Sequence, residues 1–128
     1  MTDAMRKRFS GKSVLVADNA EIVVDVLSEA LRCLAGRLDT AGSGTEAFAK
    51  IMDNDFDIIL LDILLPVISG MELYGLIKKY RPHLTTRIVF LTGDASSEEI
   101  WPFLSLCGCR FLEKPFSLKD LAYIIPRN

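Results

Sequence analysis

The sequence predicts a single α/β domain in which parallel strands alternate with helices that cover both faces of the sheet. Three observations lead to this prediction. The chain has 128 residues and half of them are hydrophobic, which suits one domain with a full core. Short apolar runs of strand length alternate with segments whose apolar residues recur at helical spacing. Strands separated by helices of this length join as parallel strands through right-handed crossovers.

The first strand and helix follow a basic N-terminal segment. Residues 1–12 carry four basic side chains without a strand or helix period, so we expect a tail or linker there and a domain over 13–128. Val14–Ala17 is a continuous apolar run that stops at Asp18, as in a strand buried on both faces. Leu38–Ala41 is half polar and predicts an edge strand. The helix between them is predicted from apolar residues at helical spacing, namely Ile22, Val23, Val26, Leu27, Ala30, Leu31 and Leu34.

Three later helices are predicted to start at capping boxes. In Ser43–Glu46, Ser69–Glu72 and Ser96–Glu99 a serine precedes a glutamate by three residues, so that each side chain can bind the other residue's backbone amide. Pro102 lies inside the third of these helices and predicts that it is kinked, short or shifted. A last short helix is expected from Ser117 to about Ile125. The remaining strands are predicted at Asp57–Asp62, Arg87–Thr92 and Phe111–Glu113.

Composition argues against several classes of partner. A net charge of −2 gives no field that attracts nucleic acid or an anionic membrane surface. The longest apolar runs are far shorter than the roughly 20 residues of a membrane span, and the three cysteines fit a reducing, cytoplasmic location. Cys107 and Cys109 lack a second pair, so we interpret them as structural rather than metal-binding.

Polar residues gather where the predicted strands end. Ligand sites in parallel sheets form at the carboxyl ends of the strands, and here these ends carry Asp18, Asn19, Asp62, Thr92 and Lys114. Asp18 alone is equally well explained as a helix N-cap. The whole set offers the oxygen ligands that Mg²⁺ prefers, together with a lysine that supplies a second positive charge.

At this point four motifs resemble the receiver domains of two-component response regulators. They are Val14-Leu15-Val16-Ala17-Asp18-Asn19, Asp57-Ile58-Ile59-Leu60-Leu61-Asp62-Ile63-Leu64-Leu65-Pro66 with Gly70, Phe90-Leu91-Thr92-Gly93, and Phe111-Leu112-Glu113-Lys114-Pro115-Phe116. All four occur in the family's order, from about Ser13 to the end of the chain. The resemblance implies a flavodoxin-like, doubly wound domain with strand order 2-1-3-4-5.

The resemblance also implies a role for each residue at the strand ends. Asp62 is expected to attack a phosphohistidine of a histidine kinase or histidine phosphotransfer protein and to form an aspartyl phosphate. Mg²⁺ is expected to bind Asp18, Asn19, Asp62 and the Leu64 carbonyl oxygen. Thr92 and Lys114 are expected to contact the phosphoryl group. This would make the domain a catalyst of its own phosphorylation and dephosphorylation, although its status as an enzyme stays open.

The same resemblance predicts how phosphorylation reaches a target. Thr92 and Phe111 are the expected switch residues, and the fourth predicted helix, fifth strand and fifth predicted helix are the expected output surface. Trp101 lies in that region as either a surface or a core residue. The motifs look most like receivers of hybrid histidine kinases, with the basic N-terminal segment as a linker. A free-standing regulator and a dimer are open alternatives.

The sequence departs from the family at two places. Asn19 occupies the position of an acid that usually contacts the metal, so we expect weaker Mg²⁺ binding. Leu64 and Asp94 occupy positions that face the attacking water during dephosphorylation, and the apolar Leu64 predicts a long-lived phosphorylated state.

Three other functions compete with phosphoacceptance. A dinucleotide site is suggested by the glycines of Gly42–Ala47, but the half-polar strand before them and the single domain argue against it. An aspartyl-phosphate hydrolase would carry an acid where Leu64 stands. A pseudo-receiver that binds proteins without turning over phosphate is favoured by Asn19.

Overall fold

Five parallel strands form one sheet in the computed structural model, which describes residues 3–125. The strand order is β2-β1-β3-β4-β5, as predicted. Asp62 at the end of β3 pairs with Leu91, and Thr92 at the end of β4 pairs with Glu113, so neighbouring strands end at one level. The strands are β1 Ser13–Ala17, β2 Arg37–Ala41, β3 Ile58–Asp62, β4 Ile88–Thr92 and β5 Arg110–Glu113.

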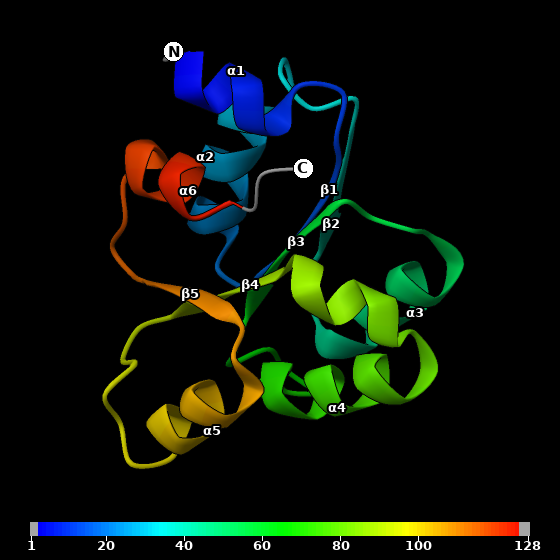
Figure 1. The fold of residues 1–128 in the computed structure, drawn as a ribbon, viewed down its shortest axis with the longest axis vertical. Helices are drawn as coiled ribbons and strands as arrows, with labels where there is room; N and C mark the ends of the chain where they lie inside the picture. Colours follow the sequence, from blue (N-terminus) through cyan, green and yellow to red (C-terminus); the bar gives the residue numbers. More distant parts are fainter. Residues whose placement is uncertain (1–2, 126–128) are drawn as a thin grey trace.

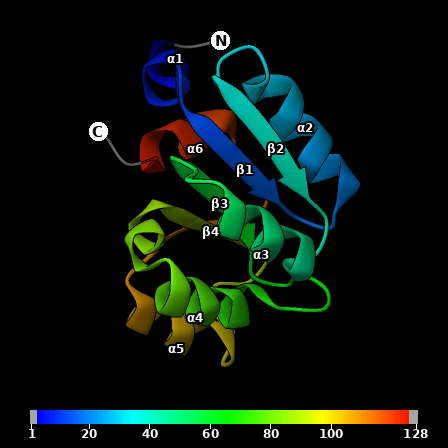
Figure 2. The same cartoon turned by 90° about the vertical axis from the view of Figure 1, so that its right-hand side faces the viewer.

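Helices cover both faces of this sheet, which confirms the doubly wound α/β fold. Figures 1 and 2 show α1, α2 and α6 on one face and α3, α4 and α5 on the other. The helices are α1 Asp3–Phe9, α2 Glu21–Leu31, α3 Gly44–Asp53, α4 Gly70–Tyr80, α5 Ile100–Cys107 and α6 Leu118–Ile124, with a 3-10 helix η1 at Pro82–Arg87.

Alternate residues of each strand enter two separate hydrophobic clusters. In β1, Val14 and Val16 face α2 and α6, whereas Leu15 and Ala17 face α3 and α4. Every residue of the central strands β3 and β4 is buried. Parallel strands buried on both faces are continuous apolar runs, which is why these strands could be predicted from the sequence.

The N-terminal segment differs from the prediction of a tail or linker. Residues Asp3–Phe9 form α1, which packs against α6 through the buried side chains of Met5 and Phe9. Arg8 Nη1 also donates a 2.8 Å hydrogen bond to the carbonyl oxygen of Ile125. Two apolar residues are too few to reveal a helical period. Residues 1–2 and 126–128 of the predicted boundaries lie outside the described residues.

Two of the three helix starts predicted from capping boxes are confirmed. Ser43 and Ser69 cap α3 and α4, and of these two only Ser69 forms the full capping box, with Glu72. The prediction for Ser96 is wrong: α5 begins at Ile100, whose amide donates to Ser97 Oγ at 3.0 Å. Pro102 therefore lies in the first turn of α5, where it removes no intrahelical hydrogen bond. The helix is short, as predicted, at eight residues.

No helix within residues 3–125 is long and apolar enough to span a membrane.

Candidate functional site

Four polar residues lie together at the carboxyl edge of the sheet. Asp18 follows β1, Asp62 and Thr92 end β3 and β4, and Lys114 follows β5. Asp18, Asp62 and Thr92 are buried, although polar side chains at strand ends are usually solvated. The parallel register brings them to one level, so the sequence prediction of a shared polar site agrees with the geometry.

The Asp18 carboxylate is held on two sides. Its Oδ1 accepts a 2.9 Å hydrogen bond from the backbone amide of Ala20, the residue before α2. Its Oδ2 lies 2.5 Å from Lys114 Nζ. Asp18 is therefore not the N-cap of α2, because that position is Ala20 and has no side-chain cap. Asp18 accepts the amide of Ala20 through one oxygen, while its other oxygen faces the site.

Lys114 bridges the two carboxylates. Its Nζ lies 2.5 Å from Asp18 Oδ2 and 3.7 Å from Asp62 Oδ2. Its backbone amide donates a 2.7 Å hydrogen bond to the Thr92 carbonyl oxygen, which holds the Lys114 backbone beside the end of β4. The Lys114–Pro115 peptide bond is cis. One ammonium group thus faces two carboxylates, and the negative charge exceeds the positive.

Burial and charge act together on Asp62. Desolvation raises the pKa of its carboxyl, and the neighbouring Asp18 carboxylate raises it further. The Leu64 backbone amide, which donates to Asp62 Oδ1 at 3.1 Å, and the charge of Lys114 lower the pKa by smaller amounts. The pKa of Asp62 is therefore raised overall, which means that the surrounding protein groups do not fully stabilise its charged form.

Thr92 and the loop after it border the same site. Thr92 Oγ1 accepts a 3.2 Å hydrogen bond from the Asp94 amide, and Gly93 and Asp94 are exposed. The Ala95 amide donates to Glu113 Oε2 at 3.3 Å, which links this loop to the end of β5. The Glu113 contact could not be predicted from the sequence, because it depends on the register between β4 and β5.

Asn19 and Leu64, the two departures from the expected motif, are both on the surface. Asn19 is exposed beside buried Asp18, and Leu64, two residues after Asp62, is 61 % exposed. Within residues 3–125 no group of three or more His, Cys, Asp or Glu side chains is arranged to hold a metal ion. The metal donors predicted from the sequence include only two such side chains, the carboxylates of Asp18 and Asp62. The other two predicted donors are the amide of Asn19 and the backbone carbonyl of Leu64.

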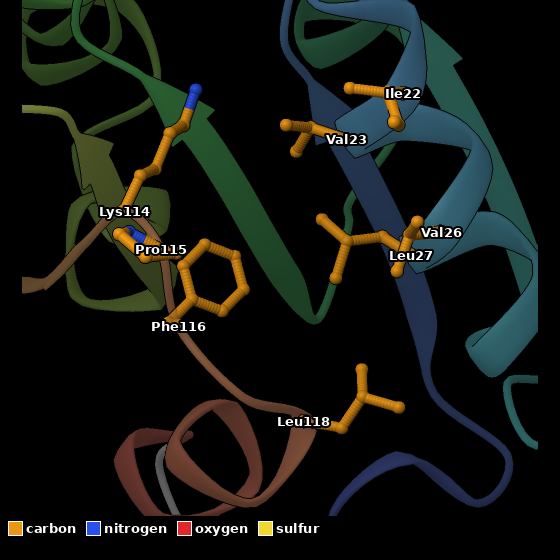
Figure 3. Close-up of a pocket in the computed structure, with 8 residues that line it drawn as sticks. All are labelled: Ile22, Val23, Val26, Leu27, Lys114, Pro115, Phe116 and Leu118. Carbon is orange, nitrogen blue, oxygen red and sulfur yellow. The ribbon is translucent and has the colours of Figure 1, made fainter.

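An apolar groove runs beside the site and could not be seen in the sequence. It has a volume of about 380 Å³ and lies between α2 and the segment that joins β5 to α6. Figure 3 shows Ile22 and Val26 of α2 on one side and Pro115 and Phe116 on the other. Lys114 also lines it, so the groove adjoins the polar site. Ile22 and Val26 are 74 % and 54 % exposed.

Comparison with known proteins agrees with this geometry. The sequence model of the response regulator receiver domain matches residues 14–125. The chain belongs to this family. This receiver domain is 30 % identical over 118 residues to the DNA-binding transcriptional regulator NtrC of Azospirillum brasilense, a match that covers 92 % of the chain but 24 % of NtrC. The chain spans less than half the length of the first curated relatives it matches.

Solved structures of receiver domains have the same fold. A CheY-like receiver domain of Methanospirillum hungatei JF-1 superposes with a TM-score of 0.78 at 29 % identity, covering 89 % of this chain and 90 % of that one. The receiver domain of a Pseudomonas aeruginosa PAO1 sensor histidine kinase gives a TM-score of 0.78 at 26 % identity, covering 90 % and 94 %. In that structure a magnesium ion is coordinated in the active site cleft.

The residues of this receiver domain fit a divalent cation. Asp62 and Asp18 are buried side by side with one ammonium group between them, and the pKa of Asp62 is raised by its surroundings. A cation bound there would offset the excess negative charge, and carboxylate, amide and carbonyl oxygens are the ligands that Mg²⁺ prefers. The site offers two carboxylates to the cation, because the neutral Asn19 stands where the family usually has a third acid.

The competing dinucleotide interpretation fails on packing. A Cβ atom on Gly44 would lie 1.9 Å from the Ile68 carbonyl oxygen, and the Gly44 amide donates to the Pro66 carbonyl oxygen at 3.0 Å. This glycine is therefore needed for contact with the β3–α4 loop, and its amide is occupied. It also follows β2, which is an edge strand.

The two expected switch residues lie on neighbouring strands. Thr92 is fully buried at the end of β4, and Phe111 is half-buried in β5. The Trp101 ring of α5 packs edge-on against Phe111, with centroids 6.4 Å apart, while about half of Trp101 is exposed. Trp101 is therefore a surface residue in contact with an expected switch residue.

Proposed function

We propose that this receiver domain accepts a phosphoryl group on Asp62 from a phosphohistidine and so acts in a two-component phosphorelay. The observation that carries the proposal is the contact of Lys114 Nζ with both buried carboxylates, Asp18 and Asp62. A cation placed against a strand-end carboxylate is what phosphoryl transfer requires, because the transferred group carries negative charge throughout.

In the proposed step an oxygen of Asp62 attacks the phosphorus atom. A P–O bond forms to Asp62 as the P–N bond to the imidazole breaks, and the imidazole leaves and takes up a proton. The Leu64 amide, 3.1 Å from Asp62 Oδ1, fixes the rotamer of the nucleophile. Lys114 moves from its pair with Asp18 toward the phosphoryl oxygens, and Thr92 Oγ1 is released from the Asp94 amide to donate to them.

Mg²⁺ bound by Asp18, Asp62, the Asn19 amide oxygen and the Leu64 carbonyl oxygen would supply the second positive charge against the phosphoryl group. Asp18 serves this charge balance without forming a bond to phosphorus. Its buried position and its hydrogen bond from Ala20 keep the carboxylate directed at the site.

The phosphodonor is a histidine kinase or a histidine phosphotransfer protein that docks in the apolar groove of Figure 3. The groove adjoins Lys114 and presents the exposed residues Ile22 and Val26, so an apolar helix surface next to the phosphohistidine would bury them. Phosphorylation then shifts Thr92 and Phe111 and changes the surface formed by α5, β5 and α6.

A second function, binding of a protein partner without phosphorylation, is favoured by one observation. Asn19 is neutral and exposed at a metal-ligand position, which leaves two carboxylates for the cation. Leu64 is not an acid, so the position two residues after Asp62 offers no acid and base for an aspartyl-phosphate hydrolase.

The test is intact mass after incubation with acetyl phosphate, with and without Mg²⁺. Addition of one phosphate to the wild type, its loss in Asp62→Asn and its dependence on Mg²⁺ support phosphoacceptance. Absence of phosphate at saturating Mg²⁺ refutes it and supports the pseudo-receiver.

The groove is tested separately with a purified histidine phosphotransfer protein that carries phosphohistidine. Val26→Asp is expected to slow transfer from the protein donor and to leave phosphorylation by acetyl phosphate unchanged. Equal loss with both donors would contradict docking in the groove.

A further inference from the structure

Two thiols that the phosphoacceptor site does not use lie together at the opposite end of the sheet. Cys107 ends α5 and Cys109 precedes β5, with Gly108 between them. Gly108 adopts a left-handed conformation with φ of 71°, which turns the chain back at the helix end. The turn brings residues 107 and 109 onto the same side.

The contacts between the two cysteines are direct. The Cys109 amide donates to Cys107 Sγ at 3.4 Å, and the Cys107 thiol itself donates to the Leu104 carbonyl oxygen at 3.6 Å. Cys109 Sγ additionally lies 3.6 Å from the Thr85 carbonyl oxygen. Both side chains are partly buried, whereas the third cysteine, Cys33, is exposed elsewhere.

A small opening leads to this pair. A pocket of about 150 Å³ is lined by both cysteines together with Tyr74, Thr85 and Thr86. It is large enough for a small oxidant such as hydrogen peroxide, and too small for a bulky thiol reagent to enter without displacement. The pair is therefore reachable by small molecules although its sulfur atoms pack against the core.

We propose that Cys107 and Cys109 form a reversible disulfide when a peroxide reaches this pocket. Cys107 is the attacking thiol, because its sulfur accepts the hydrogen bond of the Cys109 backbone amide, and Cys109 resolves the product. Burial and the neighbouring Cys107 raise the pKa of Cys109 to about 12, so this thiol keeps its proton at neutral pH and donates it to the Thr85 carbonyl oxygen.

The reaction is balanced by the peroxide. The Cys107 sulfur forms an S–O bond as the O–O bond breaks, giving a sulfenic acid and one water molecule. The Cys109 sulfur then forms the S–S bond as the S–O bond breaks, and the oxygen leaves as a second water molecule. Two thiols are oxidised, and one hydrogen peroxide molecule is reduced to two water molecules.

The modification would cross-link the turn between α5 and β5. These elements carry Trp101 and Phe111, which are in contact. Oxidation at the turn therefore acts on the surface that the proposed function assigns to output, while the disulfide itself does not depend on Asp62.

The test is intact mass and thiol titration of the whole chain after a short exposure to hydrogen peroxide. The wild type is expected to lose two hydrogen atoms and two of its three titratable thiols, with both restored by dithiothreitol. Cys33→Ser is the matched control and is expected to lose two hydrogen atoms in the same way. Cys107→Ser and Cys109→Ser are each expected to retain their hydrogen atoms.

Peptide mapping without reduction makes the result specific. The expected product is one peptide with an internal Cys107–Cys109 disulfide. Gain of oxygen atoms without loss of hydrogen, or a disulfide that contains Cys33, would overturn the proposal.

Discussion

Replacing Asp62 by asparagine is expected to stabilise the metal-free protein at neutral pH. Asp62 is 5 % exposed and lies beside the Asp18 carboxylate, and one lysine serves both. Burial and Asp18 raise the pKa of Asp62, so the charged form is less favourable in the folded protein than in the unfolded chain. Asparagine removes the charge and keeps an oxygen that can accept the Leu64 amide.

The magnitude follows from the cost of an under-compensated buried charge. Leaving a buried polar group without a full partner costs about 1–3 kcal/mol. Lys114 already offsets part of this for Asp62, so we expect a gain of about 1 kcal/mol for Asp62→Asn. For a domain of this length the gain corresponds to a rise in Tm of about 4 °C.

The pH dependence has a definite sign. Because the folded pKa of Asp62 lies above its ordinary value of 3.8, the folded state binds the proton more tightly than the unfolded chain. The wild type therefore loses stability as pH rises from that value through the folded pKa, and the loss persists at neutral pH. The gain from Asp62→Asn should thus be present at pH 7 and absent below 3.8.

The assay is thermal unfolding followed by circular dichroism, at pH 7 and at about pH 3, with and without Mg²⁺. Mg²⁺ at tenfold excess over its Kd would stabilise the wild type by about 1.4 kcal/mol and Asp62→Asn by less, which closes the gap. Glu29→Gln removes an exposed carboxylate of α2 and should change stability by less than about 0.5 kcal/mol. A destabilised Asp62→Asn at pH 7, or an equal gain at both pH values, would refute the electrostatic reasoning.

Three further predictions concern other parts of the chain. Asn19→Asp should tighten Mg²⁺ binding, measured by Trp101 fluorescence or calorimetry; unchanged affinity would mean that the neutral amide is equivalent. Phe9→Ala should lower the free energy of unfolding by about 3–5 kcal/mol in urea, because Phe9 is fully buried, whereas Leu106→Ala at an 88 % exposed site should change it little. Lys50→Met should remove a pH-dependent contribution of about 0.5 kcal/mol, since the hydrogen bond from Lys50 Nζ at 2.8 Å lowers the pKa of Asp39. That contribution is present above pH 3.8 and disappears as pH falls through the lowered pKa, so the Tm difference between wild type and variant should shrink in acid.

The sequence by itself determined the strands, most helix starts and the polar residues of the site. Strands such as Ile58–Asp62 are buried on both faces, so they can be predicted from a continuous run of apolar residues. Parallel strands end on one edge, and this rule alone brings Asp18, Asp62, Thr92 and Lys114 together. These predictions needed only local patterns and the right-handed crossover.

Only the tertiary structure decided the features that depend on contacts distant in sequence. The segment that contains Met5 and Phe9 is helical because α6 provides the surface that buries these two side chains. No local pattern in the sequence predicts this helix. The start of α5 at Ile100, with Glu99 and not Ser96 at the N-cap, depends on where the β4–α5 loop places the helix. The groove between Ile22 and Phe116 exists only once the fold places α2 beside the segment after β5. The contact of the Cys109 amide with Cys107 Sγ likewise depends on the left-handed Gly108 between them.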